Sequence, residues 1–293
     1  MWGIYREQKN TLRDLTLKNY FMFGAVMADE ENCRRFLELA LGVSIERVEV
    51  SKEQSLIYRP EYRGVRLDVY ARDAENTRYN VEMQVAKHLS LPKRARYYHS
   101  QIDMELLTKG EDYSKLPYTY VIFICDFDPF GKGRYCYHFV NRCEEDKELA
   151  LEEGNHTIFL STCGRNEHEV PESMVKFLKF VHANLEESQQ DFDDEFVKRL
   201  QDSIQRIRQS HEMEERYMLF EELLRDERAA GQAEGKAEGK AEAVLLFLEE
   251  LGEVPDSIRE KILLVKDSTV LDVMLKSAAK AASVEQFVKD VRL

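Results

Sequence analysis

Two short stretches, Val65-Arg66-Leu67-Asp68-Val69-Tyr70 and Tyr79-Asn80-Val81-Glu82-Met83-Gln84-Val85, decide how the N-terminal half of this chain folds. Apolar and polar residues alternate strictly in both, the pattern of β-strands with one buried face. Joined by a short turn, the strands form an antiparallel hairpin in which Asp68 must lie opposite one of the polar residues of the second stretch. Because the turn is centred on Glu75, the symmetric partner is Glu82.

Two directly opposed carboxylates predict a cation between them. Their Cβ atoms would lie about 5 Å apart, and like charges at that distance repel. A divalent metal ion is the most economical candidate, with Asp68 and Glu82 as ligands and the backbone carbonyl of Met83 within reach. Gln84 shares the face of Glu82 and is placed to orient a water molecule, so the set suits a metal-dependent phosphodiesterase. The spacing also recurs by chance, and an exposed hairpin with two solvated acids explains it equally well.

The charge distribution favours an anionic ligand near this hairpin. The chain carries a net charge of −13, which argues against non-specific binding of nucleic acid by the molecule as a whole. Residues 59–96, however, contain nine bases and five acids, so this segment is +4 and the rest of the chain is −17. The alternative to an anion-binding segment is a polar surface on which these bases and acids form salt bridges with one another. The side chains that we expect to contact DNA phosphates or to support the site are Arg66, Lys93, Arg94, Tyr97 and Gln101.

Three other polar residues have simpler explanations than catalysis. His99 lies on the helix face beside Gln101 and either assists the site or is a surface histidine, the second being the simpler interpretation. Asp126 and Asp128 precede Pro129, and turn formation explains them better than metal binding does.

The bulk composition predicts a soluble cytoplasmic protein with no membrane partner. At 293 residues and 43% hydrophobic content, the chain is long enough for one large domain and a smaller one. No apolar run reaches membrane-spanning length, and the N-terminus lacks the core of a signal peptide. Its five scattered cysteines include no CxxC pair, which argues against a zinc site and fits reduced thiols.

Hydrophobic periodicity predicts a mixed α/β domain with the element order α-β-β-β-α-β. We expect a helix over residues 17–41, a strand within 45–57, the hairpin, and a helix over 94–107 that begins after Pro92. The continuous apolar run at 118–127 suits a buried central strand. Further strands are expected at 134–141 and 156–160.

The C-terminal part is predicted to be helical. A Gly-x-Ala-Glu repeat occupies residues 231–242, and a helix there would stack like charges and contain three glycines. We therefore expect a weak helix serving as a hinge or spacer, the alternative being a small-residue stripe for close helix pairing. The predicted domains are a nuclease-like core at 15–165, a helical extension at 166–230, a linker at 231–242 and a small helical tail at 243–293.

Around the acidic hairpin the chain resembles a known family. The segment Asp68…Glu82-Met83-Gln84 and the following Lys93-Arg94-Ala95-Arg96-Tyr97-Tyr98-His99-Ser100-Gln101 are similar to the PD-(D/E)xK nuclease superfamily. More narrowly, they resemble the bacterial recombination-promoting nuclease/transposase family. Supporting matches are Gly110-Glu111-Asp112-Tyr113 before Tyr120-Val121-Ile122-Phe123-Ile124, the opening Phe21-Met22-Phe23-Gly24 with Asp29-Glu30-Glu31-Asn32, and the Gly-x-Ala-Glu repeats.

This resemblance extends over roughly residues 15–242 and implies a restriction-endonuclease-like fold. It further implies a Mg²⁺-dependent DNA endonuclease active in mobile-element, recombination or phage-defence biology, with Asp68, Glu82 and Gln84 as catalytic residues. Gln84 stands where the superfamily often has lysine, and an amide supplies no positive charge. The family also uses Gln here, so the resemblance implies a variant site. Asn19 and Met22 stand where relatives often show an acid and a lysine, so no third acid is assigned.

Two further hypotheses accompany the endonuclease. The first is a non-catalytic DNA-binding or regulatory protein that keeps the nuclease fold and assembles through its helical tail. The second is a transposase, although nothing in the sequence favours strand transfer over hydrolysis. Cleavage of both strands by a single site usually calls for a second protomer, which makes a homodimer a reasonable expectation.

Overall fold

A computed structural model describes residues 11–51, 55–56, 65–66 and 68–292, and the chain divides into two compact units, Met1–Glu215 and Arg216–Leu293. In the described part of the chain, no helix combines the length and hydrophobicity needed to cross a membrane. The helices of the first unit are α1 (Tyr20–Met27), α2 (Glu30–Leu41), α3 (Leu91–Leu106), α4 (Glu172–His182) and α5 (Glu195–Gln209), with short 3₁₀ helices η1 (Leu12–Asp14), η2 (Tyr113–Lys115), η3 (Glu167–Glu169) and η4 (Glu187–Gln189). Its strands are β1 (Val48–Ser51), β2 (Ser55–Leu56), β3 (Val65–Arg66), β4 (Val69–Asp73), β5 (Arg78–Gln84), β6 (Thr119–Cys125), β7 (Cys136–Phe139) and β8 (Asn155–Ser161).

Six of these strands form one mixed sheet in the order β1-β4-β5-β6-β8-β7. The pairs β1–β4, β4–β5 and β7–β8 are antiparallel, whereas β5–β6 and β6–β8 are parallel. Along the chain the core elements run α2-β1-β4-β5-α3-β6, which confirms the predicted order α-β-β-β-α-β. The architecture is a mixed α/β sheet of the restriction-endonuclease-like type, followed by C-terminal helices.

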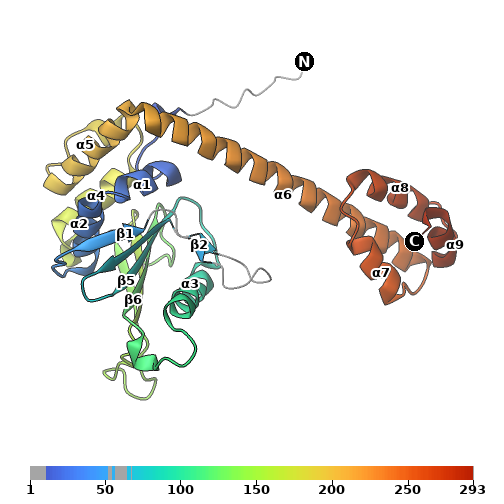
Figure 1. Cartoon of the computed structure of the whole chain (residues 1–293), viewed down its shortest axis with the longest axis horizontal. Helices are drawn as coiled ribbons and strands as arrows, with labels where there is room; N and C mark the ends of the chain where they lie inside the picture. The colour runs from blue at the N-terminus through green and yellow to red at the C-terminus, as the bar shows by residue number, and fades with distance from the viewer. Residues whose placement is uncertain (1–10, 52–54, 57–64, 67, 293) are drawn as a thin grey trace. The chain divides into compact units, whose positions relative to one another are not determined.

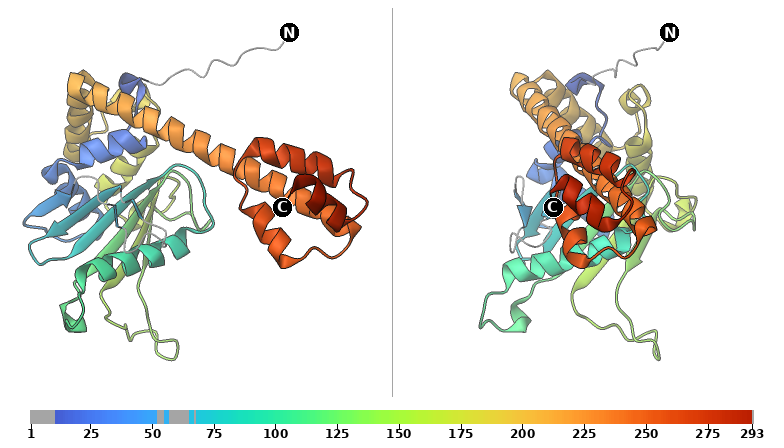
Figure 2. Two further views of the ribbon diagram at one scale, coloured as in Figure 1. Left: turned by 45° about the vertical axis from the view of Figure 1, so that its right-hand side comes forward. Right: turned by 90° about the vertical axis from the view of Figure 1, so that its right-hand side faces the viewer.

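Helix α3 lies against one face of this sheet because it connects two parallel strands, β5 and β6 (Figure 1, Figure 2). Its apolar residues recur every three or four positions and are buried against alternate residues of β6. The buried residues at this contact are Leu91, Ala95, Tyr98 and Ile102 of α3 and Val121, Phe123 and Cys125 of β6. Helices α2, α4 and α5 pack together elsewhere in this unit, with the Phe36 and Phe177 rings 5.5 Å apart.

Two helix predictions need correction because capping residues interrupt the apolar pattern. The expected helix at 17–41 is two helices, since α1 ends before Ala28 and Asp29 caps α2 by accepting from Asn32 N–H. Within the C-terminal part, a single helix is expected through residues 192–224, and the structure instead ends α5 before Ser210 and begins α6 at His211. Side chains that bond to the backbone at a helix start compete with continuation of the preceding helix.

The predicted hairpin differs from the observed one in two respects. Residues 65–70 do not form one strand: β3 pairs with β2 in a separate two-stranded sheet, Asp68 lies in a bend, and β4 begins at Val69. Leu67 lies outside the described residues. The polar face of β5 was expected to face solvent, yet every residue of β5 is buried. The reason is tertiary, because β5 is a central strand with β4 and β6 at its sides and α3 over this face.

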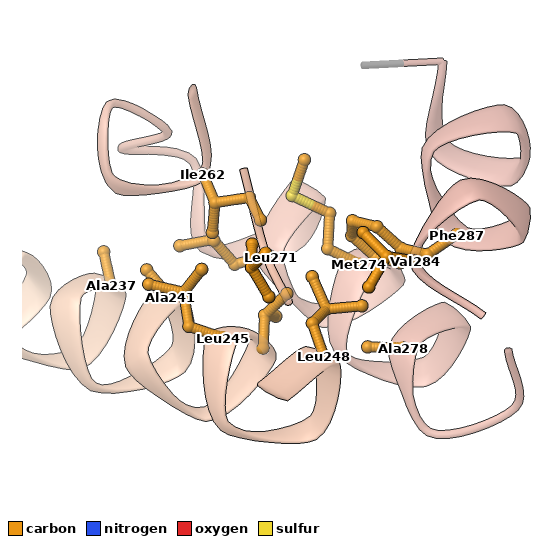
Figure 3. Close-up of a cluster of buried hydrophobic side chains, with 12 residues drawn as sticks. Ala237, Ala241, Leu245, Leu248, Ile262, Leu271, Met274, Ala278, Val284 and Phe287 are labelled. Carbon is orange, nitrogen blue, oxygen red and sulfur yellow. The ribbon is translucent and has the colours of Figure 1, made fainter. Parts of the chain in front are cut away.

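The second unit contains all of α6 (His211–Leu251) from Arg216 onward, together with α7 (Asp256–Leu263), α8 (Ser268–Ala278) and α9 (Val284–Val291). The Gly-x-Ala-Glu repeat lies inside α6, so the expectation of a weak helix and hinge is wrong. Ala237 and Ala241 of the repeat are buried in the core of this unit, where Leu248, Met274 and Phe287 meet (Figure 3). Packing on these alanines offsets the helix-propensity cost of the glycines, of about 1 kcal/mol each.

The repeat contributes its alanines to packing, not its glycines. A Cβ placed on any of its three glycines would meet no atom within 4 Å. One lysine and one glutamate of the repeat form ion pairs with residues outside it: Lys240 pairs with Asp272 of α8, and Glu234 pairs with Lys266 of the loop between α7 and α8. These ion pairs relieve the stacking of like charges that the repeat would suffer as an isolated helix.

Candidate metal-dependent nuclease site

The hairpin register brings the two predicted acids together. Val69 pairs with Val81 at the start of β4, and extending this register by one residue places Asp68 opposite Glu82. Each acid is also bonded to the backbone of the other segment. Met83 N–H donates to Asp68 Oδ2 at 3.0 Å, and Asp68 N–H donates to Glu82 Oε1 at 3.4 Å. The structure therefore confirms the symmetric pairing that the turn centred on Glu75 predicts.

Glu82 is a buried carboxylate held by a cation. Its exposed fraction is 1%, and its Oε2 accepts from Arg94 Nη2 at 2.7 Å and from the Tyr98 hydroxyl at 3.4 Å. Burial raises the pKa of the Glu82 carboxyl, and the neighbouring Arg94 guanidinium offsets this only in part. A carboxylate in such surroundings gains free energy from any additional cation that reaches it.

Arg94 bridges the acid and the glutamine of the predicted motif. While Nη2 contacts Glu82, Nη1 donates to Gln84 Oε1 at 3.3 Å and Nε donates to the Tyr98 hydroxyl at 2.7 Å. The guanidinium carbon lies 5.3 Å from the centre of the Tyr98 ring and 5.8 Å from that of Phe123. Because arginine has only donors, the amide oxygen of Gln84 must face Arg94, which leaves the Gln84 NH₂ group for another partner.

The remaining predicted residues occupy different surroundings. Lys93 is exposed at the start of α3, Tyr97 is half-buried, and Gln101 is buried two turns after Arg94. The backbone of Met83 adjoins the Asp68 carboxylate through the N–H contact given above. Arg66 belongs to β3, and its side chain lies outside the described part of the structure.

Sequence analysis missed two features of the site. The spacing of four positions places Tyr98 on the helix face of Arg94, but it does not predict that the Tyr98 hydroxyl bonds to both Arg94 and Glu82. At the same sheet edge, Asp126 N–H donates to the Gln84 carbonyl at 2.9 Å. The Asp126 carboxylate accepts from Lys18 at 3.2 Å and contacts the His182 ring at 2.6 Å. No local pattern identifies that cluster, because its members are more than 50 residues apart.

Asp128 has the turn role that was predicted for it. Its carboxylate accepts from three backbone N–H groups of the following loop, at Phe130, Gly131 and Gly133. These bonds fold the chain back after β6, as expected for an aspartate at the start of a turn.

The donor set of the site fits Mg²⁺. This ion usually takes one or two protein carboxylates and completes its shell with water and substrate phosphates. The described residues contain no group of three or more His, Cys, Asp or Glu side chains suited to a metal ion. Asp68 and Glu82 supply two carboxylate side chains from one hairpin, which is the number that Mg²⁺ commonly takes from a protein.

His99 is neither a surface histidine nor part of the acidic site. It is buried, with its ring nitrogens 2.7 Å from Thr119 Oγ1 and 3.1 Å from Thr157 Oγ1. Burial lowers the pKa of His99 to about 4. The face of α3 that looks surface-exposed in the sequence is covered by β6 and β8, which places this histidine in the core.

The burial of His99 predicts acid-labile stability. In the unfolded chain the histidine takes up a proton near pH 6.5, whereas in the folded protein it does so only near pH 4. The unfolded state therefore binds more protons in this window, and stability falls as the pH drops from 6.5 to 4, by roughly 3 kcal/mol in the limit. Urea unfolding at several pH values checks this: the pH slope should flatten in His99→Gln. Parallel pH profiles for the two proteins would contradict the prediction.

A family model described as a PD-(D/E)XK nuclease family transposase matches residues 17–234. A comparison with curated proteins found no match, and neither did a comparison with solved structures. The matched segment contains the acidic hairpin, α3 and the buried strand β6, and it covers more than half of the chain. The chain thus belongs to the PD-(D/E)XK nuclease family transposases.

Proposed function

We propose that this protein is a Mg²⁺-dependent endodeoxyribonuclease that hydrolyses phosphodiester bonds of DNA. The observation that carries this proposal is the buried carboxylate of Glu82, opposite Asp68 in the hairpin register and held by a basic side chain from α3. Nuclease-type chemistry in this family is consistent with such a site. The metal ion, the DNA substrate and the hydrolytic outcome are our assignments.

The residues have distinct proposed roles. Asp68 and Glu82 hold Mg²⁺, with the Met83 carbonyl as a third protein ligand. When bound, the ion supplies Lewis-acid stabilisation of the phosphoryl group and lowers the pKa of a bound water. Gln84 orients the attacking water through its amide NH₂ group, since its oxygen already accepts from Arg94. The residues proposed to bind DNA or support the site are Arg66, Lys93, Arg94, Tyr97 and Gln101.

The biological setting is proposed on the same basis. We place the protein in the cytoplasm, where it acts in mobile-element, recombination or phage-defence processes. The five cysteines of the chain are free, as reducing surroundings require. A homodimer would bring two sites to the two DNA strands. In domain terms, we propose a nuclease core at 15–165, a helical extension at 166–230 and a helical tail at 243–293, with the repeat at 231–242 contributing Ala237 and Ala241 to the core of the tail.

A second candidate function rests on Gln84. Because an amide carries no charge, the site has fewer cationic groups than phosphodiester cleavage usually employs. The alternative is therefore a non-catalytic DNA-binding or regulatory protein that retains the nuclease fold.

Plasmid cleavage tests the proposal directly. Purified protein is incubated with supercoiled plasmid in Mg²⁺, in chelator, and in Mg²⁺ with Asp68→Ala. We expect nicked or linear product only for the wild type in Mg²⁺. Equal cleavage by Asp68→Ala would show that this acid is not a ligand, and equal cleavage in chelator would show that no metal is needed.

Calorimetric titration separates the two candidate functions. A nuclease should take up Mg²⁺ in the absence of DNA, and Asp68→Ala should not. DNA binding without metal uptake and without cleavage would favour the regulatory alternative.

A further inference from the structure

Gln84 is uncharged and gives the site no cation, but the guanidinium of Arg94 lies next to it. Its two terminal nitrogens contact the Glu82 carboxylate and the Gln84 amide oxygen, at 2.7 and 3.3 Å. A phosphodiester bond that is cleaved develops negative charge on the phosphoryl and leaving oxygens, and preorganised cations stabilise that charge. Arg94 thus places a permanent positive charge beside Glu82 and Gln84, although these two residues belong to β5 and Arg94 belongs to α3.

The surroundings of Arg94 hold the guanidinium in one orientation. Nε donates to the Tyr98 hydroxyl, four residues on along α3, and the guanidinium lies near the Tyr98 and Phe123 rings. The Phe123 ring is itself fixed by Phe159, 5.0 Å away between centres. A side chain held on three sides needs little reorganisation when charge develops nearby, which is the condition for electrostatic catalysis.

Arg94 also remains accessible to a substrate. About a third of its side chain, 34%, is exposed, whereas Glu82 beneath it is 1% exposed. The hydrogen bonds given for Arg94 among the described residues use three of its five N–H groups. The two further N–H groups, one on each terminal nitrogen, are available to a phosphate oxygen in the bidentate manner that suits arginine.

We propose that Arg94 supplies, from α3, the positive charge that stabilises the scissile phosphate, and that Gln84 and Arg94 together replace a single cationic side chain. This inference rests on the proposed nuclease function. It makes Arg94 a catalytic residue with a contact to the substrate, beyond general support of the site, and it gives Tyr98 the part of a positioning residue.

An experiment that moves the positive charge from position 94 to position 84 tests this assignment. Arg94→Met removes the charge, and we expect plasmid cleavage in Mg²⁺ to slow at least about 100-fold, as when one preorganised donor is removed. Two double variants then differ in charge alone at nearly equal size: Gln84→Lys with Arg94→Met, and Gln84→Met with Arg94→Met. The lysine variant should cleave at least about tenfold faster than the methionine variant. Thermal unfolding verifies that both are folded, and filter binding in Ca²⁺ compares their affinity for DNA.

Chemical rescue gives a readout that a purely structural role would not move. Arg94→Ala leaves a partly exposed gap beside Glu82, and added guanidinium ion at millimolar concentration should restore part of the cleavage rate. Ammonium should restore less, because it lacks the planar fork.

The outcomes distinguish this inference from the proposed function. A wild type that does not cleave DNA in Mg²⁺ would remove the nuclease function and this inference with it. A wild type that cleaves, together with equal rates for the two folded double variants and no guanidinium rescue, would overturn the role of Arg94 alone. A faster lysine variant together with rescue supports it.

Discussion

Replacing Glu82 by Gln should reduce Mg²⁺-dependent cleavage by about 10³-fold or more while leaving the fold intact. The amide keeps the shape of the side chain and an oxygen that accepts from Arg94 and Tyr98, so these two hydrogen bonds persist and only the 3.4 Å bond from Asp68 N–H to Oε1 is lost. In the proposed site the negative charge of Glu82 attracts the metal, and its loss corresponds to about 4 kcal/mol or more in the barrier. Removing a buried charge also removes its desolvation cost, so the free energy of unfolding should change by less than about 2 kcal/mol.

This separation of activity from stability identifies a functional charge. Three measurements are needed on one preparation: plasmid cleavage, Mg²⁺ titration by calorimetry, and urea unfolding. Glu49→Gln is a matched control, because Glu49 is an acid of the edge strand β1 of the same sheet, where its half-exposed side chain pairs with Arg72 of β4. That variant should cleave like the wild type. If Glu82→Gln lost stability by several kcal/mol and bound Mg²⁺ normally, Glu82 would be a structural acid only.

The register of the site could be predicted because it depends on local geometry. Side chains in strands alternate with a period of two, and a turn centred on Glu75 admits one symmetric pairing, Asp68 with Glu82. The buried strand β6 could be predicted equally well, since its apolar run has no charged interruption. Parity, turn length and run length are read from neighbouring residues, and tertiary structure rarely overrides them when all three agree.

The burial of the site could not be predicted, because it depends on what packs over the strand. Alternation in β5 is typical of one solvated face, yet α3 covers that face and buries Glu82 and Gln84. For the same reason the basic residues Lys93, Arg94 and Arg96 look equivalent in the sequence. Only the phase of α3 against the sheet decides that Arg94 contacts the acid while Lys93 is exposed.

The repeat in α6 shows the same division between local and tertiary terms. Helix propensity and like-charge spacing argue against a helix at residues 231–242, and those terms amount to a few kcal/mol at most. Burial of Ala237 and Ala241 against α7–α9 outweighs them. The local sequence pattern does not show the free energy gained by this burial. The helices that cover the two alanines follow later in the chain, and their placement is known only from the fold.

The tail core is small enough for one substitution to unfold it, which is the second large effect that we expect. Phe287→Ala removes a fully buried ring from α9, at the point where Leu248 and Met274 meet it (Figure 3). Such a deletion costs about 3–5 kcal/mol. A core formed by so few residues supplies about 3–5 kcal/mol in total. The variant should therefore lose the folded state of α7, α8 and α9, while the six-stranded sheet of the first unit keeps its own core.

Hydrogen exchange measured by mass spectrometry tests this expectation separately for each segment of the chain. Amides of residues 256–291 should exchange freely in Phe287→Ala, whereas those of β6 and α3 should stay as protected as in the wild type. Leu264→Ala is the matched control, because Leu264 is an apolar residue of the same unit that is 75% exposed, and its loss should cost less than about 0.5 kcal/mol. Loss of protection in β6 together with the tail would mean that the two units unfold as one, because a shared core would then couple the tail to the sheet.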